Sequence, residues 1–414
     1  MSEVPGYSLF ERVGVEIEYM IVDAASMDVR PLADELLRAA AGDYVNEHEA
    51  DDLTWSNELV VHVFELKVTE PVATLDGVAD RFQANVAEIN RRLAAWNARL
   101  MPTAAHPWMD PERDAKLWPH EYAEIYRQFD TIFGCRTHGW TNLQSQHLNL
   151  PFRGDDEFGR LHAAIRLLLP LLPALAAASP YLDGRFAGLL DARLEAYRTN
   201  AQKIPSIAGK VIPEAVFTEA AYRHEILERL YREAEPHDPG GILRYEWTNA
   251  RGAIARFERN TIEIRVLDAQ EYPVADLAIA WAVLHVLRAL TEQRWGSRSD
   301  QQSFEVEPLR RILLDCMRDA EAAQITDSAY LRALGYTAAG HASAREVWAH
   351  LLESVVPDHP QYGPALDIWR RHGCLARRML SFAGEAPDRD RLRALAGALC
   401  DCLSEGRPFL PEST

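Results

Sequence analysis

Three segments that lie far apart in the chain alternate between apolar and polar residues. They cover residues 12–23, 142–150 and 261–268. An alternation with a period of two is typical of a β-strand that packs one face against a core. The apolar positions are Val13, Val15, Ile17, Tyr19 and Ile21 in the first segment, Leu148 and Leu150 in the second, and Ile262, Ile264 and Val266 in the third. The pattern predicts three strands, each with one polar face.

Much of the remaining chain follows the 3.6-residue period of amphipathic helices. Helices are predicted at residues 31–41, 72–100, 118–133, 159–178, 214–235, 274–294, 305–323, 343–356, 362–382 and 388–404. Further β-structure is predicted near Val45, over 57–69 and within 242–268, where LRYEW is a strand and GAIARF and TIEIRVLD form a hairpin. Strands therefore come singly or in hairpins between helices of unequal length. This order favours an α+β fold with an antiparallel or mixed sheet over a doubly wound fold.

The 414 residues are enough for one large domain or for two to three smaller ones. A Ser/Gln-rich stretch at 297–303 is the one linker candidate, and the chain beyond it is almost entirely helical. We therefore expect a sheet-containing domain at 1–298 and a helical C-terminal extension at 299–414 that packs on the same core. The extension could cap the rest of the molecule, mediate self-association into a homo-oligomer, or both.

Charge and composition argue against several classes of protein. Asp and Glu number 62 against 44 Lys and Arg, a formal net charge of −18, which disfavours nucleic acid as a partner. The five cysteines show no metal-binding or redox spacing, as is typical of reduced, buried thiols in a cytosolic protein. No secretory signal is visible, and the longest apolar stretch, 167–178, is too short to span a bilayer. We expect a cytoplasmic protein that binds no membrane.

Acidic residues occupy the polar faces of the predicted strands. Glu16 and Glu18 project from one face of the first strand, so their carboxylates repel each other, and a hard divalent cation offsets such repulsion best. Taken alone, this strand could simply present a solvated polar face. The third strand, however, places Glu263 and Arg265 on its polar face, and the second places His147 there together with Ser145 and Asn149. Aligned in one sheet, the three strands would line a polar basin.

A fourth segment, NELVVHVFELK at 57–67, adds two more carboxylates. Glu58 and Glu65 have opposite parity, so both reach one site only if Glu58 precedes the regular strand or a bulge intervenes. Five carboxylates and one imidazole suit two or three Mg²⁺ or Mn²⁺ ions better than zinc. The candidate metal ligands are Glu16, Glu18, Glu58, Glu65, His147 and Glu263.

Arginines beside these segments are candidates for binding phosphate or carboxylate, because the guanidinium fork matches both. They are Arg193, Arg198, Arg251, Arg256 and Arg265. Arg251 and Arg256 could instead form salt bridges on the sheet, whereas Arg265 shares a face with Glu263. The sequence contains no GxGxxG and no GxxxxGK[ST], so metals and arginines would have to hold any nucleotide.

At these same residues the chain resembles glutamate-cysteine ligase family 2, which includes bacterial carboxylate-amine ligases of the YbdK type. The similarity covers roughly residues 10–295 and depends on the combination of several motifs. These are GVEIEYMIVD at 14–23, NELVVHVFELKVTEP at 57–71, HLNLPF at 147–152, SPYLDGRFAGLLDARLEAYR at 179–198 and RGAIARFERNTIEIRVLDAQEYPVADLA at 251–278. Family members often carry His-x-His on the middle strand, where this chain has His147 and Asn149.

The resemblance implies a glutamine-synthetase-like catalytic domain, with a curved, mainly antiparallel sheet that forms a funnel and helices on its outer side. It implies ATP and Mg²⁺ as cofactors, with Mn²⁺ as an alternative, and a small carboxylate and an amine as substrates. Transferred to this chain, the six candidate ligands take the metal positions, and Arg265 with Glu263 takes the catalytic position. Arg193, Arg198, Arg256 and Asn149 are expected to contact the nucleotide or substrate.

The resulting hypothesis is ATP-dependent amide bond formation through an acyl phosphate, with glutamate and cysteine as default substrates. Three alternatives stay open: a ligase for another amino acid or amine, a guanidino- or amine-directed phosphotransferase, and a nucleotide-binding homologue without turnover. A phosphotransferase would yield ADP and a phosphorylated product but no amide. A homologue without turnover would bind ATP without hydrolysing it.

Overall fold

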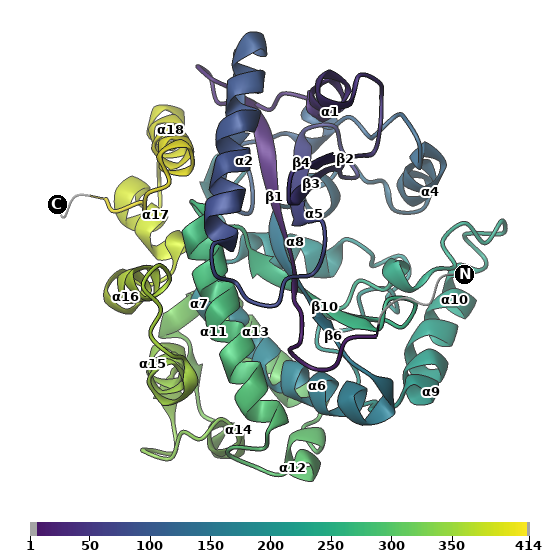
Figure 1. Cartoon of the computed structure of the whole chain (residues 1–414), viewed down its shortest axis with the longest axis vertical. Helices are drawn as coiled ribbons and strands as arrows, with labels where there is room; N and C mark the ends of the chain where they lie inside the picture. The colour runs from purple at the N-terminus through teal and green to yellow at the C-terminus, as the bar shows by residue number, and fades with distance from the viewer. Residues whose placement is uncertain (1–5, 412–414) are drawn as a thin grey trace.

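The computed structural model describes residues 6–411, and within them one antiparallel sheet organises the molecule (Figure 1). Seven strands follow the order β2-β3-β4-β1-β6-β10-β9, and β5 pairs with the far end of β1. The strands are β1 (Gly14–Asp23), β2 (Glu47–Ala50), β3 (Leu53–Asn57), β4 (Val63–Val68), β5 (Ala98–Met101), β6 (Ser145–Pro151), β9 (Ala253–Arg256) and β10 (Thr261–Asp268). All pairings are antiparallel. The fold class predicted from the alternating segments is confirmed.

The apolar face of the sheet is covered by helices. The helices before residue 295 are α1 (Ala33–Ala41), α2 (Val78–Leu93), α3 (Pro111–Asp114), α4 (Ala123–Phe133), α5 (His138–Thr141), α6 (Gly154–Leu168), α7 (Leu172–Ala176), α8 (Ala192–Thr199), α9 (Glu219–Tyr222), α10 (Glu228–Ala234) and α11 (Pro273–Thr291). Helix α2 buries one stripe of side chains at helical spacing, from Val78 through Phe82, Val86 and Ile89 to Leu93. Helix α11 is buried along most of its surface, because it packs against α2, α6 and helices of the C-terminal region.

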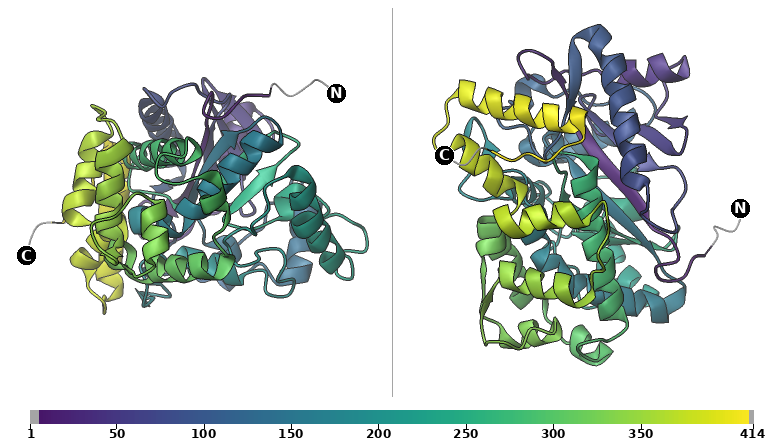
Figure 2. Two further views of the ribbon diagram at one scale, coloured as in Figure 1. Left: turned by 90° about the horizontal axis from the view of Figure 1, so that it is seen from below. Right: turned by 60° about the vertical axis from the view of Figure 1, so that its left-hand side comes forward.

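The C-terminal helices are α12 (Arg298–Gln302), α13 (Val306–Asp319), α14 (Ser328–Ala333), α15 (Ala344–Val355), α16 (Gly363–His372), α17 (Leu375–Ala383) and α18 (Arg389–Glu405). The last four form an outer layer, shown in yellow-green to yellow in Figures 1 and 2, whereas α12 packs against α6 and α13 against α7. Two-residue strands pair locally as β7 (Tyr181–Leu182) with β8 (Arg185–Phe186) and β11 (Gln324–Ile325) with β12 (Ala342–Ser343). Residues such as Trp348 and Trp369 share one hydrophobic cluster with the sheet. The division at residue 298 stays a prediction.

Several predicted helices are shorter or broken, each for a local reason. The helix predicted at 159–178 is two helices, because Pro170 and Pro173 interrupt the backbone hydrogen bonds between α6 and α7. The one predicted at 362–382 divides into α16 and α17 at Gly373, whose φ is 80°. The one predicted at 72–100 ends before Asn97, whose φ of 52° turns the chain into β5.

Other predicted boundaries are also wrong. LRYEW forms no strand, and Glu246–Thr248 is a single 3₁₀ turn. The β-structure predicted over 57–69 is confined to β4, and the helix predicted at 214–235 begins only at α9. The helix predicted at 118–133 likewise begins at Ala123.

Two helical segments are long and apolar enough to cross a membrane by length and composition alone, Gly154–Ala176 and Pro273–Thr291. Within the protein, 94% and 67% of their apolar windows are buried, as expected of core helices. The five cysteines are all buried and unpaired, as predicted.

Candidate active site

Strand register arranges polar side chains in three rows on one face of the sheet, opposite its apolar face. Because paired residues of antiparallel strands project to the same side, each row runs across several strands. The first row holds Ser56, Glu65 and Glu18, the second holds Thr54, Lys67, Glu16 and His147, and the third holds Asn149 and Glu263. The alternation that predicted the strands thus also selects the residues of this face.

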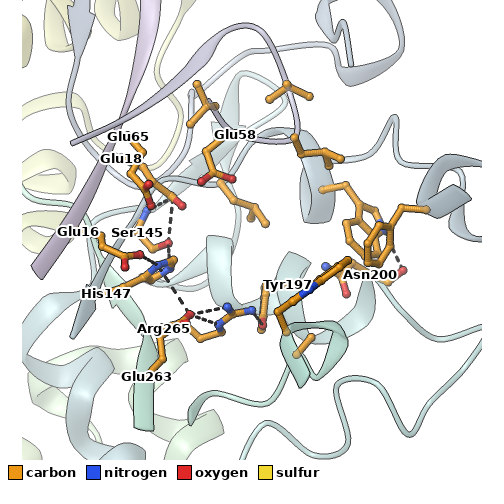
Figure 3. Close-up of a pocket in the computed structure, with 18 of the residues that line it drawn as sticks. Glu16, Glu18, Glu58, Glu65, Ser145, His147, Tyr197, Asn200, Glu263 and Arg265 are labelled. Carbon is orange, nitrogen blue, oxygen red and sulfur yellow. Dashed lines mark hydrogen bonds and ion pairs between the residues drawn. The ribbon is translucent and has the colours of Figure 1, made fainter. Parts of the chain in front are cut away.

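This face forms the floor of a cavity of about 370 Å³ whose two ends differ in chemistry (Figure 3). One end is lined by carboxylates with Ser145 and His147 between them. The other end holds Asn200 and Trp140, against which Phe129 packs, and Phe129 in turn contacts Trp247. Together with Tyr126 and Tyr197, these rings are the five aromatic side chains of the lining, which we name the aromatic wall. Lys67, Arg193, Arg256, Arg259 and Arg265 add cationic groups to the lining. A cavity of this kind offers separate surfaces for a charged group and for an apolar or planar group.

Glu16 and His147 form an ion pair in the middle row. Nδ1 of His147 lies 3.0 Å from Oε2 of Glu16, and Oε1 of Glu16 accepts a hydrogen bond from Asn149. Burial alone would raise the pKa of Glu16, but the hydrogen bond and charge of His147 hold this pKa at about 2. Burial alone would lower the pKa of His147, but Glu16, Glu18 and Glu263 raise it to about 9. Without a bound cation, His147 therefore carries the charge that balances its neighbours.

The other carboxylates lie in a strongly negative environment. Oε2 of Glu18 accepts hydrogen bonds from the backbone N–H and the hydroxyl of Ser145, at 2.7 and 3.0 Å. Burial, followed by the charge of Glu16, raises the pKa of Glu65 to about 8, although the Ser56 hydroxyl donates to this carboxylate. Burial and the charges of Glu18 and Glu65 raise the pKa of Glu58 well above its ordinary value. Glu58 lies directly after β3, before the regular strand β4, which is one of the two placements that its parity required.

The arrangement fits the hard divalent cations expected from the sequence. Ligand atoms of Glu16, Glu65 and His147 lie within 4.8 Å of one another, and those of Glu18, Glu58 and Glu65 do so too. Oxygen-rich donor sets with at most one imidazole suit Mg²⁺ or Mn²⁺. Glu65 belongs to both groups and would bridge two ions. Opposite charges there would also relieve the repulsion that raises the pKa of Glu58 and Glu65.

Glu263 and Arg265 form a second charged pair beside the carboxylate end. Nε of Arg265 donates to Oε1 of Glu263 at 3.0 Å, and Nη2 donates to the same oxygen. Arg256 lies 3.5 Å from the other oxygen of Glu263. Nη1 of Arg265 reaches the hydroxyl of Tyr197 on α8 at 3.5 Å. Burial would raise the pKa of Glu263, but Arg265 and His147 hold it below its ordinary value.

The remaining predicted arginines divide into two groups. Arg193 lines the cavity, where Asp268 binds its Nε at 2.5 Å and its Nη2 has no partner within residues 6–411. Arg198 is not among the lining residues. It pairs instead with Glu195 one turn earlier on α8, so the structure gives it no contact with the cavity. Arg251 pairs with Glu214 as a buried structural ion pair, the alternative that the sequence left open.

Several lining residues were not predicted. Lys67 shares the parity of Glu65, and that signal could have identified it. Tyr197 and Asn200 follow Arg193 at helical spacing, but the polar segment that contains them was not predicted to be a helix. The residues of the aromatic wall come from α4, α5, α8 and the turn at Glu246–Thr248, and no sequence pattern links these segments. Asn149 contacts Glu16 but does not line the cavity.

Comparison with known proteins places this geometry in a family. The sequence model of glutamate-cysteine ligase family 2 matches residues 12–390. An uncharacterized protein of Archaeoglobus fulgidus is 37% identical over 281 residues, which cover 68% of this chain and 75% of that protein. A glutamate-cysteine ligase of Halobacterium salinarum is 28% identical over 324 residues, which cover 75% of this chain and 79% of that protein.

Solved structures share the fold at low sequence identity. The glutamate-cysteine ligase of Francisella tularensis in complex with AMP matches 98% of this chain and 91% of its own, with a TM-score of 0.61 and 12% identity. A bifunctional glutathione synthetase from Pasteurella multocida matches 95% of this chain and 53% of its own, with a TM-score of 0.51 and 14% identity. These similarities confirm the fold that the sequence resemblance implied.

Proposed function

The chain belongs to glutamate-cysteine ligase family 2, and from this membership and the geometry of the cavity we propose that it is an ATP-dependent carboxylate-amine ligase. The observation that carries the proposal is the convergence of four carboxylates and His147 next to the Glu263 and Arg265 pair. Such a set neutralises and positions a triphosphate, and phosphoryl transfer depends mainly on positioning and charge stabilisation. Glutamate and cysteine are the default substrates, because they are the substrates named for relatives such as the H. salinarum protein.

In the proposed reaction, a substrate carboxylate oxygen attacks the γ-phosphorus of ATP, and the bond to the β-phosphate oxygen breaks. This gives ADP and an acyl phosphate. The amine nitrogen then attacks the acyl carbon, the bond to the phosphate oxygen breaks, and the amine loses a proton. When bound, Mg²⁺ would supply charge neutralisation for the phosphates.

The chain's own residues have distinct proposed roles in this reaction. Glu16, Glu18, Glu58, Glu65 and His147 would hold the ions. Glu263, the sixth predicted ligand, lies outside these two ligand groups and pairs with Arg265. Arg265 is oriented by Glu263 and Tyr197 and would stabilise charge on the transferred phosphoryl group, with Arg256 beside it. Arg193 would bind an anionic substrate group through its unpartnered Nη2. These roles require no protein nucleophile, in keeping with the absence of a serine-hydrolase motif around Ser145.

The proposal is tested by incubating the purified protein with ATP, Mg²⁺ and a panel of amino acids and amines, followed by mass spectrometry for ADP and for the amide. We expect ADP and amide in equal amounts, and loss of both in Glu263→Gln. The matched control is Glu49→Gln, which changes an exposed carboxylate on β2 that does not line the cavity. ADP with a phosphorylated product and no amide would identify a phosphotransferase instead. ATP binding without ADP formation would identify a homologue without turnover.

A further inference from the structure

The aromatic end of the cavity is a preformed surface. The ring centroid of Phe129 lies 5.3 Å from that of Trp140 and 6.0 Å from that of Trp247, so these three residues of the aromatic wall pack together. Phe133 and Tyr245 support them from behind, with Phe133 5.3 Å from Trp140 and Tyr245 stacked 5.4 Å from Trp247. Side chains that already contact each other lose little freedom when a ligand binds. The wall is therefore ready to receive an apolar or cationic group.

Helix α8 presents one face along the cavity. Arg193, Tyr197 and Asn200 follow one another at spacings of four and three residues, which places them on one side of the helix, and all three line the cavity. Figure 3 shows Tyr197 in the middle and Asn200 on the side opposite the carboxylates. A substrate that lies along this face would have one end near the reacting centre and another near Asn200.

Asn200 has an unused hydrogen-bond acceptor. Its Nδ2 donates to the backbone oxygen of Gly139 at 2.6 Å, whereas its Oδ1 is shielded from solvent and has no partner within residues 6–411. The neighbouring donor is also occupied, because Nε1 of Trp140 donates to the backbone oxygen of Asn200 at 3.1 Å. A buried acceptor without a partner is unfavourable by about 1–3 kcal/mol. A ligand group that pairs with Oδ1 of Asn200 must therefore carry an N–H or O–H donor.

The surroundings favour a cationic donor. Aromatic side chains attract ammonium groups through their ring electrons, and Trp140 of the aromatic wall directly adjoins Asn200. We propose that Asn200 Oδ1 and the aromatic wall hold an ammonium group of a substrate, and that this group is not the amine that reacts. This inference rests on the proposed ligase function, since it names a recognition site within the same cavity.

Such an ammonium has two possible sources. It is either the α-ammonium of an amino acid whose side-chain carboxylate is activated, such as glutamate, or the second amine of a diamine acceptor. Two matched pairs of probes separate these sources. Glutarate lacks the α-ammonium of glutamate, and butylamine lacks the second amine of 1,4-diaminobutane.

The experiment measures binding of the four probes by isothermal titration calorimetry to the full-length protein with Mg²⁺ and a non-hydrolysable ATP analogue. It also measures KM for amide formation with each probe. We expect the ammonium-bearing member of one pair to bind about tenfold to a hundredfold more tightly, as for a hydrogen bond to a charged group. Asn200→Leu should abolish that preference and leave affinity for the ATP analogue unchanged. Asn85→Leu, a matched change on α2 away from the cavity, should retain the preference.

If Asn200→Leu does not fold, Trp247→Leu provides the test from a different segment, because it removes part of the wall without touching Asn200. Equal affinity within both pairs in the wild type would overturn the proposal. So would variants that weaken binding of the ATP analogue and leave the probe preference intact, since the wall would then hold the nucleotide. An ammonium preference without amide formation would refute the proposed function alone, and amide formation without the preference would refute this inference alone.

Discussion

Nδ1 of His147 lies 3.0 Å from Oε2 of Glu16, although the two residues are 131 positions apart in the chain. They are paired positions of the neighbouring strands β6 and β1, so strand register brings them together. The ion pair orients both side chains and keeps Glu16 ionised, with a pKa of about 2. The protein thus holds two proposed ligands in place before a cation arrives, and a cation must displace the proton of His147 to use it.

Replacement of Glu16 by glutamine tests whether this pair belongs to a metal site. Glu16→Gln removes a charged ligand from the Glu16, Glu65 and His147 group, so we expect Mn²⁺ affinity to fall by about tenfold to a hundredfold. Calorimetric titration with Mn²⁺ measures this directly, without reliance on turnover. Circular dichroism should show an intact fold. Unchanged Mn²⁺ affinity in a folded variant would contradict the assignment of Glu16.

Lys67 lies in the same row of side chains as Glu16 and His147, and we expect it to lower the affinity of the site for cations. Its Nζ lies 3.4 Å from Glu65 and 2.6 Å from Glu47, and it is paired with Glu16 across β4 and β1. Lys67→Met removes a positive charge beside the carboxylates, so Mn²⁺ should bind more tightly by about 1–2 kcal/mol, or roughly tenfold. The metal-free protein should melt at a lower temperature, because the carboxylates lose a counter-ion.

Thermal melts of Lys67→Met with and without MgCl₂ measure both effects. The matched control is Lys116→Met, an exposed lysine that does not line the cavity. Weaker Mn²⁺ binding in Lys67→Met would show instead that Lys67 helps to position Glu65 for the ion.

The two arginines of α8 should differ sharply in their effects. Arg198→Ala removes a partly exposed pair with Glu195 outside the cavity, so we expect a stability change of about 0–1 kcal/mol and unchanged ADP release. Arg193→Lys keeps a charge near Asp268 but loses the planar guanidinium that lines the cavity. We expect its KM for the carboxylate substrate to rise by at least about tenfold. Steady-state kinetics on both variants measures these effects. Equal changes in KM would contradict the placement of Arg193 inside the cavity and Arg198 outside it.

The strand faces could be predicted because alternation determines which side chains share a face, and a slip of one residue would reverse every assignment. Glu16, Glu18, Glu65 and Glu263 therefore lie together as the parity of their strands requires. Even the exceptional parity of Glu58 indicated its position before β4. Parity works here because the apolar sides of these strands are buried against helices.

The other side of the cavity could not be predicted in this way. The distinction between Arg193 and Arg198 depends on the rotation of α8, and the segment around it has no clear apolar stripe from which a helical phase could be derived. Trp140 and Trp247 become neighbours of Phe129 only through tertiary packing of separate segments. Such contacts leave no local sequence pattern, so the aromatic wall could not be predicted from the sequence.

Buried histidines should make the protein sensitive to acid. His62, His106 and His162 are fully buried, and burial lowers their pKa to about 4, 4 and 3. The unfolded chain protonates them near pH 6.5, so the stability they contribute is present above that pH and is lost as pH falls toward 4. Each contributes up to about 1.4 kcal/mol per pH unit in this window.

Urea unfolding between pH 4 and pH 7 tests this expectation by comparing the wild type with His162→Gln. The glutamine variant should be less stable at pH 7, because Nδ1 of His162 pairs with the backbone oxygen of Val216 at 2.7 Å. Its stability should nevertheless fall less steeply with acid. Parallel curves for the two proteins would contradict the role of His162.

Gly139 sets the distance between α5, which carries Trp140, and α8, which is followed by Asn200. A Cβ at this position would collide with the backbone oxygen of Ala196 and would lie 2.7 Å from Cβ of Asn200. Gly139→Ala should therefore push the two helices apart, lower the free energy of unfolding by about 1–3 kcal/mol, and weaken the proposed ammonium preference. Gly397→Ala on α18 is the control, because nothing lies within 4 Å of its Cβ and alanine favours a helix by about 0.5–1 kcal/mol. Urea unfolding and the matched probe pairs measure the two effects, and a Gly139→Ala variant with wild-type stability and preference would show that this close approach positions neither Trp140 nor Asn200.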